Sequence, residues 1–74
     1  MARLIRLDRT GHTTLAEWTA GDAMAEEAAV DAFRRELDRG MVASVSHPNG
    51  DAEVVRELPL HAELVVLRRP IAGG

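Results

Sequence analysis

The chain contains no cysteine and no lysine, and its only large aromatic side chains are Trp18 and Phe33. Without cysteine it cannot form a disulfide framework, a thiolate zinc site or a thiol nucleophile. No apolar run approaches the roughly 20 residues that span a bilayer, and charged residues interrupt the N-terminal segment before a secretion-type apolar core forms. We therefore expect a soluble cytoplasmic protein that does not contact membranes.

Length and charge narrow the possible functions further. At 74 residues the chain is expected to form one small domain, which buries only about 60% of the surface exposed on unfolding. That size excludes a second domain and a large catalytic cleft. The nine basic residues, all arginine, are outnumbered by twelve acidic ones, for a net charge of -3. Because the arginines are mostly interleaved with acids along the chain, we expect no clustered positive surface and no nucleic-acid binding.

The first twenty residues have the pattern of a β-hairpin. Residues 2–8 mix β-branched and long apolar residues with charged ones at short spacing, which favours a strand. Thr10 and Gly11 supply turn chemistry, and the threonine-rich residues 13–19 predict a second strand that pairs back on the first.

A helix is the strongest prediction in the sequence, over residues 23–39. Asp22 can accept hydrogen bonds from the free N–H groups at its start, and Gly40 can take the left-handed conformation that ends it. Glu26 falls near the apolar stripe and is expected at its rim. The stripe that should face a sheet has the required three- and four-residue spacing and consists of Ala29, Val30, Phe33 and Leu37.

The second half returns to strand patterns. Residues 41–46 and 52–58 predict a second hairpin, in which Asn49-Gly50 favours the two positive-φ positions of a tight turn. Residues 64–67 are consecutive apolar residues, a pattern typical of a central strand buried on both faces and parallel to the first strand. Pro70 cannot donate to a strand ladder and marks the start of a tail.

The predicted element order is therefore ββαβββ, an α+β fold in which one helix packs on one face of a five-stranded mixed sheet. Residues 1–69 would form the single domain and residues 70–74 a C-terminal tail ending in Gly-Gly.

This element order resembles the β-grasp, or ubiquitin-like, fold. Residues 60–74 look like the last strand and tail of the small sulfur-carrier proteins of thiamine and molybdopterin biosynthesis, which end in hydrophobic, small, Gly-Gly, as in Ile71, Ala72, Gly73 and Gly74. Ubiquitin similarly has arginines just before its terminal Gly-Gly, where this chain has Arg68 and Arg69.

The resemblance implies a function centred on the carboxylate of Gly74. An E1-like enzyme would use ATP to attach AMP to this carboxylate, and sulfide transfer or an amine would then give a thiocarboxylate or an amide. Gly73 and Gly74 would be the reactive tail, whereas the docking residues would be Arg68, Arg69, Pro70, Ile71 and Ala72. The chain itself would be neither an enzyme nor the holder of a cofactor. Because it has no lysine, it could not form lysine-linked chains with itself.

The alternative is a structural or assembly subunit, for example a small virion or complex component, that uses its sheet as a docking surface. In that case Gly73-Gly74 is an ordinary chain end.

Other candidate sites are weaker. His12, His47 and His61 lack metal-ligand spacing, and the acidic residues Asp8, Glu17, Asp51 and Glu53 are best explained as solvated sheet edges. Trp18 is expected as a core plug or a lid on the helix. The Arg34-Arg35 and Arg68-Arg69 doublets are expected as rim charges or as anchors for an acidic partner.

Overall fold

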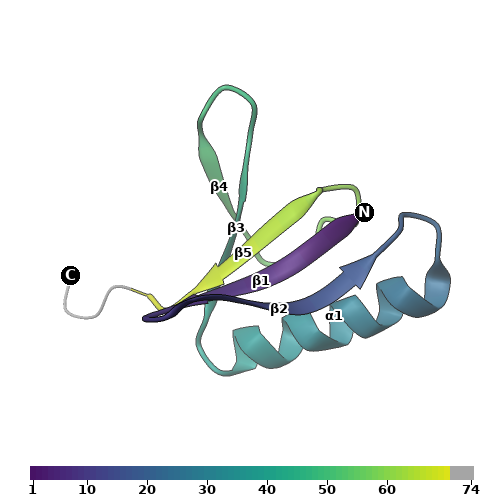
Figure 1. Ribbon diagram of the computed structural model, residues 1–74, viewed down its shortest axis with the longest axis horizontal. Helices are drawn as coiled ribbons and strands as arrows, with labels where there is room; N and C mark the ends of the chain where they lie inside the picture. The colour runs from purple at the N-terminus through teal and green to yellow at the C-terminus, as the bar shows by residue number, and fades with distance from the viewer. Residues whose placement is uncertain (71–74) are drawn as a thin grey trace.

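The computed structural model describes residues 1–70, and its elements follow the predicted ββαβββ order (Figure 1). They are β1 (Ala2–Asp8), β2 (Gly11–Trp18), α1 (Ala23–Asp38), β3 (Val42–Ser46), β4 (Ala52–Val55) and β5 (Leu64–Arg68). The strands form one five-stranded sheet, and the helix lies along one face of it. The α+β class, the single helix and the mixed sheet are thus confirmed.

The strand order across the sheet is β2-β1-β5-β3-β4. Strands β1 and β5 are parallel neighbours, and every other neighbouring pair is antiparallel. The last strand therefore lies in the middle of the sheet beside the first, as its apolar run predicts. The prediction that it is buried on both faces is wrong, because Val65 and Leu67 are fully buried whereas Leu64 is 42% exposed and Val66 half-buried. Among the described residues, only one face of the sheet has a covering helix.

Four strands differ from their predicted ranges, two of them by one residue: β3 begins at Val42 instead of residue 41, and β5 ends at Arg68 instead of residue 67. Strand β2 begins at Gly11 instead of residue 13, because the Asp8 carboxylate holds the preceding turn by accepting from the N–H and hydroxyl of Thr10 at 2.9 and 2.8 Å. Strand β4 ends at Val55 instead of residue 58. Beyond it, Leu58 and Leu60 pack against the core, so the chain leaves the sheet edge before it returns to β5.

The connection from β3 to β4 is not the tight turn that Asn49-Gly50 predicts. In the described part of the chain only glycines have positive φ, so Asn49 does not, whereas Gly50 has a φ of 91°. The Gly50 N–H donates to the His47 carbonyl at 2.9 Å, and the His47 N–H donates to the Asp51 carbonyl at 2.8 Å. Pro48 presets its own φ for the second position of this turn, which favours a longer loop closed by a left-handed glycine.

Both helix ends follow the predicted capping chemistry. The Asp22 carboxylate accepts from the Ala25 N–H at 3.3 Å, and the half-buried Glu26 accepts from the Gly21 N–H at 3.1 Å. At the other end Gly40 has a φ of 92° and donates to the Leu37 carbonyl, while Met41 donates to the Glu36 carbonyl. These two bonds form a Schellman motif, which requires the left-handed conformation of Gly40.

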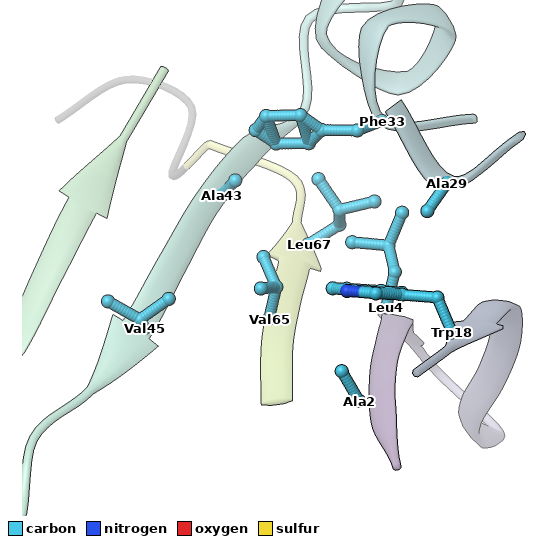
Figure 2. Packing of buried hydrophobic residues seen from close by; sticks show 9 residues of the cluster. All are labelled: Ala2, Leu4, Trp18, Ala29, Phe33, Ala43, Val45, Val65 and Leu67. Atoms are coloured by element: carbon cyan, nitrogen blue, oxygen red, sulfur yellow. The ribbon is translucent and has the colours of Figure 1, made fainter. Parts of the chain in front are cut away.

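The core lies between the helix and the covered face of the sheet, and Figure 2 shows its members. Trp18 is a core plug, 1% exposed, and its indole Nε1 donates to the Leu60 carbonyl at 3.0 Å. A buried Trp is expected to find such a partner for its N–H. The buried apolar cluster comprises Ala2, Leu4, Trp18, Ala29, Phe33, Ala43, Val45, Val65 and Leu67.

The predicted helix stripe is only partly correct. Ala29 and Phe33 are buried, but Val30 and Leu37 are half-buried, and the third buried helix residue is the charged Glu36. Leu37 still packs against the core, as predicted, but near the helix C-terminus it shares the sheet-facing side of the helix with the carboxylate of Glu36. Among residues 1–70 no helix has the length and apolar character needed to cross a bilayer.

Candidate functional site

The tail predicted to carry the function begins at the end of the central strand. Arg68 is the last residue of β5 and pairs with Val42 of β3, and Arg69 and Pro70 follow it, both exposed. The remaining predicted tail residues, Ile71, Ala72, Gly73 and Gly74, lie outside the described residues. The boundary between domain and tail thus stays a prediction. The structure does show that the segment leading to the tail follows the end of β5 at Arg68.

A concave surface surrounds the start of this tail, and we call it the tail groove. Its lining is formed by residues 6–10 of β1 and the following turn, by Glu36 and residues 39–41 at the end of α1, and by residues 69–70. In Figure 1 the ends of β1 and β5 meet at this end of the sheet, where the C-terminal end of the helix also lies. Three segments far apart in the sequence therefore enclose the point where the tail leaves the domain.

The tail groove is basic, although the chain as a whole is acidic. Four arginines line it, Arg6, Arg9, Arg39 and Arg69, against the two carboxylates Asp8 and Glu36. In the sequence these arginines are interleaved with acids, and only their folding brings them together. Sequence reasoning missed this cluster, because it depends on the parallel pairing of β1 with β5 and on where the helix ends.

Glu36 organises the floor of the tail groove. It is 5% exposed, and its two carboxylate oxygens accept from different arginines: Oε1 from Arg6 Nη1 at 2.9 Å and Oε2 from Arg39 Nη1 at 3.2 Å. Burial raises the pKa of Glu36, but the hydrogen bonds from Arg6 and Arg39 outweigh burial, so the net pKa is below its ordinary value. A charged Glu36 consequently pairs with a partly buried arginine, Arg6, and with an exposed one, Arg39, whose side chains are 32% and 70% exposed.

The other two arginines of the groove are differently placed. Arg9 and Arg69 are exposed, and neither forms an ion pair or side-chain hydrogen bond with any residue in 1–70. Asp8, the nearest acid in sequence to Arg9, is engaged by Thr10, whose hydroxyl and then backbone hydrogen bonds lower the pKa of Asp8. Within the described chain, the rim of the groove therefore presents cationic groups whose hydrogen-bonding capacity is directed to solvent.

The second feature is the open face of the sheet, the side opposite α1. Successive strand residues point to opposite faces, so Leu64, Val66 and Arg68 lie opposite the buried Val65 and Leu67. Ile5 is buried on this face among its strand neighbours, although no helix covers it. Large apolar side chains here remain exposed, at 44% for Leu7, 42% for Leu64 and 62% for Val54. They lie on three different strands, with Leu64 beside Arg3 and Leu7 four residues farther along β1, so each is a separate exposed apolar position on this face.

The remaining candidate residues lie on separate elements. His12 is in β2 and His61 in the connector before β5, whereas His47 Nε2 lies 2.8 Å from Glu53 Oε1 across the β3–β4 hairpin. Among residues 1–70 no group of three or more His, Asp or Glu side chains is arranged to hold a metal ion. Of the two arginine doublets, Arg34-Arg35 is exposed on the helix and Arg68-Arg69 is divided, with Arg68 on the open face and Arg69 in the tail groove.

No protein-family model, curated protein or solved structure significantly matches this chain. Its function is therefore inferred from its own geometry: a basic groove around the start of the tail and an apolar open sheet face.

Proposed function

We propose that this chain is a ubiquitin-like carrier or modifier protein with the β-grasp topology. The single observation that carries the proposal is the sheet order β2-β1-β5-β3-β4, with parallel strands β1 and β5 at its centre and the helix between β2 and β3 in sequence. In this arrangement the C-terminal segment leaves from the end of a central strand, so the body anchors the base of a tail that can be presented to an enzyme.

The chemistry follows from the properties of a terminal glycine carboxylate. Such a group has a pKa near 3.3 and is a stable anion, and hence a poor electrophile, at neutral pH. Attack of the Gly74 carboxylate on the α-phosphorus of ATP would release pyrophosphate and form an acyl adenylate. A sulfur nucleophile or an amine would then displace AMP, giving a thiocarboxylate or an amide. Gly73 and Gly74 have no Cβ, so they can thread a narrow channel and adopt dihedral angles that other residues avoid.

In this proposal the activating enzyme supplies the nucleotide, the metal and the acid-base groups, and this chain supplies a reactive end and docking surfaces. The chain is then not itself an enzyme and holds no cofactor of its own. The docking residues are those between the sheet and the diglycine, namely Arg68, Arg69, Pro70, Ile71 and Ala72. We propose the cytoplasm as the compartment of this reaction, where ATP is available.

Activation can be tested with an E1-like enzyme from the same organism, ATP and a sulfide source. We expect pyrophosphate release and a C-terminal mass gain equal to the replacement of one oxygen by one sulfur. A variant without Gly73 and Gly74 serves as the control and should do neither. Absence of both signals, with an enzyme that is active on another carrier, would contradict the proposal.

A second function is favoured by the open face of the sheet. The exposed Leu7, Leu64 and Val54 give a non-catalytic assembly subunit an apolar docking surface. The two functions are separated by the same truncation: an assembly subunit without Gly73 and Gly74 still joins its complex, whereas a carrier without them cannot be activated.

A further inference from the structure

We propose that the tail groove binds an acidic segment of a partner protein, with Arg9 and Arg69 at its rim forming the contacts to carboxylates. This inference goes beyond activation of the tail, because it concerns a second site on the domain body. It rests on the proposed function in one respect only: if the tail is activated, the activating enzyme is the partner that would present this segment.

The charge of the groove selects an anion. Both carboxylates at the groove already have partners, since Glu36 accepts from Arg6 and Arg39, and Asp8 accepts from Thr10. Arg9 and Arg69 have no such partner among residues 1–70. Four guanidinium groups against two engaged carboxylates leave a positive potential at the mouth, which attracts an oppositely charged surface and orients its approach.

The groove also differs from a set of scattered surface charges, because a buried and paired carboxylate orders part of it. Glu36 is buried and accepts from Arg6 at 2.9 Å and from Arg39 at 3.2 Å; the Arg6 side chain is 32% exposed, whereas that of Arg39 is 70% exposed. A partner carboxylate would therefore meet one partly buried cation, Arg6, that is already oriented by Glu36, so that less side-chain entropy is lost on contact with it. Met41 and Pro70 add apolar lining, which suits a segment that carries an apolar residue beside its acids.

The rest of the molecule disfavours an extended polyanion such as a nucleic acid. With four arginines and two acids in the groove, the remaining chain holds five of the nine basic residues and ten of the twelve acidic ones. A phosphate backbone that continued beyond the groove would meet this acidic surface and be repelled. A short acidic peptide segment can be confined to the groove, so we commit to that occupant.

Binding at this position would also hold the base of the tail. Arg69 and Pro70 belong both to the groove and to the connection between β5 and the predicted diglycine. A partner that engages Arg69 consequently fixes the direction in which the following residues leave the sheet.

The test uses the full chain and a short synthetic peptide of glutamate and aspartate residues around one leucine. Calorimetry at low and raised salt measures affinity, and amide chemical-shift changes locate the peptide. We expect shifts centred on residues 9–10 and 39–41, and an affinity that falls with salt because the contacts are exposed ion pairs. The double variant Arg9→Glu, Arg69→Glu should weaken binding by at least about tenfold.

The matched control is Arg34→Glu, Arg35→Glu, which reverses two exposed arginines on the helix outside the groove and should leave affinity within about twofold. Circular dichroism and thermal unfolding verify that both variants are folded. Equal losses in the two double variants, or shifts centred away from the groove, would overturn the inference. Tighter binding of a single-stranded oligonucleotide of the same net charge would also overturn it, in favour of a phosphate ligand.

The outcome is separable from that of tail activation. The variant without Gly73 and Gly74 should bind the peptide like the full chain although it cannot be activated. Loss of peptide binding with activation intact refutes only the groove site, and the reverse result refutes only the carrier function.

Discussion

The two faces of the sheet carry similar apolar residues but bury them very differently. Along β5, Leu67 on the face covered by α1 is 0% exposed, whereas Leu64 on the open face is 42% exposed. Both residues are leucines in the same central strand, but Leu67 points to the helix and pairs with β1 and β3, whereas Leu64 points away from the helix at the start of the strand and pairs with β1 alone. The covered face provides the stability of the domain, while the open face keeps apolar surface that costs little to expose and is available to a partner.

The sharpest test of this comparison exchanges each leucine for alanine. Leu67→Ala should lower the free energy of unfolding by about 2–5 kcal/mol, because it removes buried methyl groups and leaves a cavity in the core. Leu64→Ala, the matched control in the same strand, should cost less than about 1 kcal/mol. Urea unfolding followed by circular dichroism measures both, and similar losses would show that the faces do not differ as described.

The next largest effect concerns Glu36, the buried charged residue on the covered side among residues 1–70. Glu36→Ala leaves the guanidinium of Arg6 without its carboxylate near the core, and we expect a loss of about 2 kcal/mol. The figure lies below that for a fully buried ion pair because both arginines reach solvent. Glu27→Ala, at an exposed position on the same helix, is the control and should change stability by less than about 0.5 kcal/mol. Urea unfolding of the Glu36→Ala and Glu27→Ala variants decides whether Glu36 organises this end of the domain.

A smaller effect is the pH dependence that Glu36 contributes. Its folded-state pKa is lowered below the ordinary value of 4.5, so the folded state binds the proton less readily than the unfolded state. The stabilisation is therefore complete above about pH 4.5 and is lost as the pH falls toward the folded-state pKa. The urea concentration at which half of the protein is unfolded can be measured above and below that pH. It should fall less on acidification for the Glu36→Gln variant than for the unchanged protein. An equally steep fall in both would exclude a lowered pKa at this residue.

The smallest stability effect is expected on the open face. Val54→Ser, at a position 62% exposed on edge strand β4, should change the free energy of unfolding by no more than about 0.5 kcal/mol. The same substitution should nevertheless weaken any complex that uses the open face, as pull-down of the assembled partner would reveal. A large loss of stability would mean that Val54 has a packing role instead.

Local chemistry predicted much of this fold from the sequence. The helix was predictable because Asp22 and Gly40 act within one turn of its ends. The apolar run of β5 led to the correct central position, although the burial on both faces from which that position was inferred is not found. The geometry of the β3–β4 turn was not predicted correctly, because Pro48 altered the turn that Asn49-Gly50 alone would favour.

Features that depend on contacts between residues far apart in the sequence could not be predicted from local patterns. A helical periodicity defines a stripe but not its exact rotation, so the burial of Glu36 beside Leu37 was not predicted. The arginines of the tail groove come from β1, the turn after it, the helix end and the segment after β5, and no local pattern predicts that they line one groove. The diglycine itself lies beyond the described residues, so its role stays a prediction.

The most direct measurement of the central claim is mass spectrometry of the intact C-terminus after incubation with an E1-like enzyme, ATP and sulfide. The carrier function predicts that the chain ends at Gly74 and gains the mass of one oxygen-to-sulfur exchange there, with none in the variant lacking Gly73 and Gly74. An unchanged terminus, while the same enzyme modifies another carrier in parallel, would contradict it.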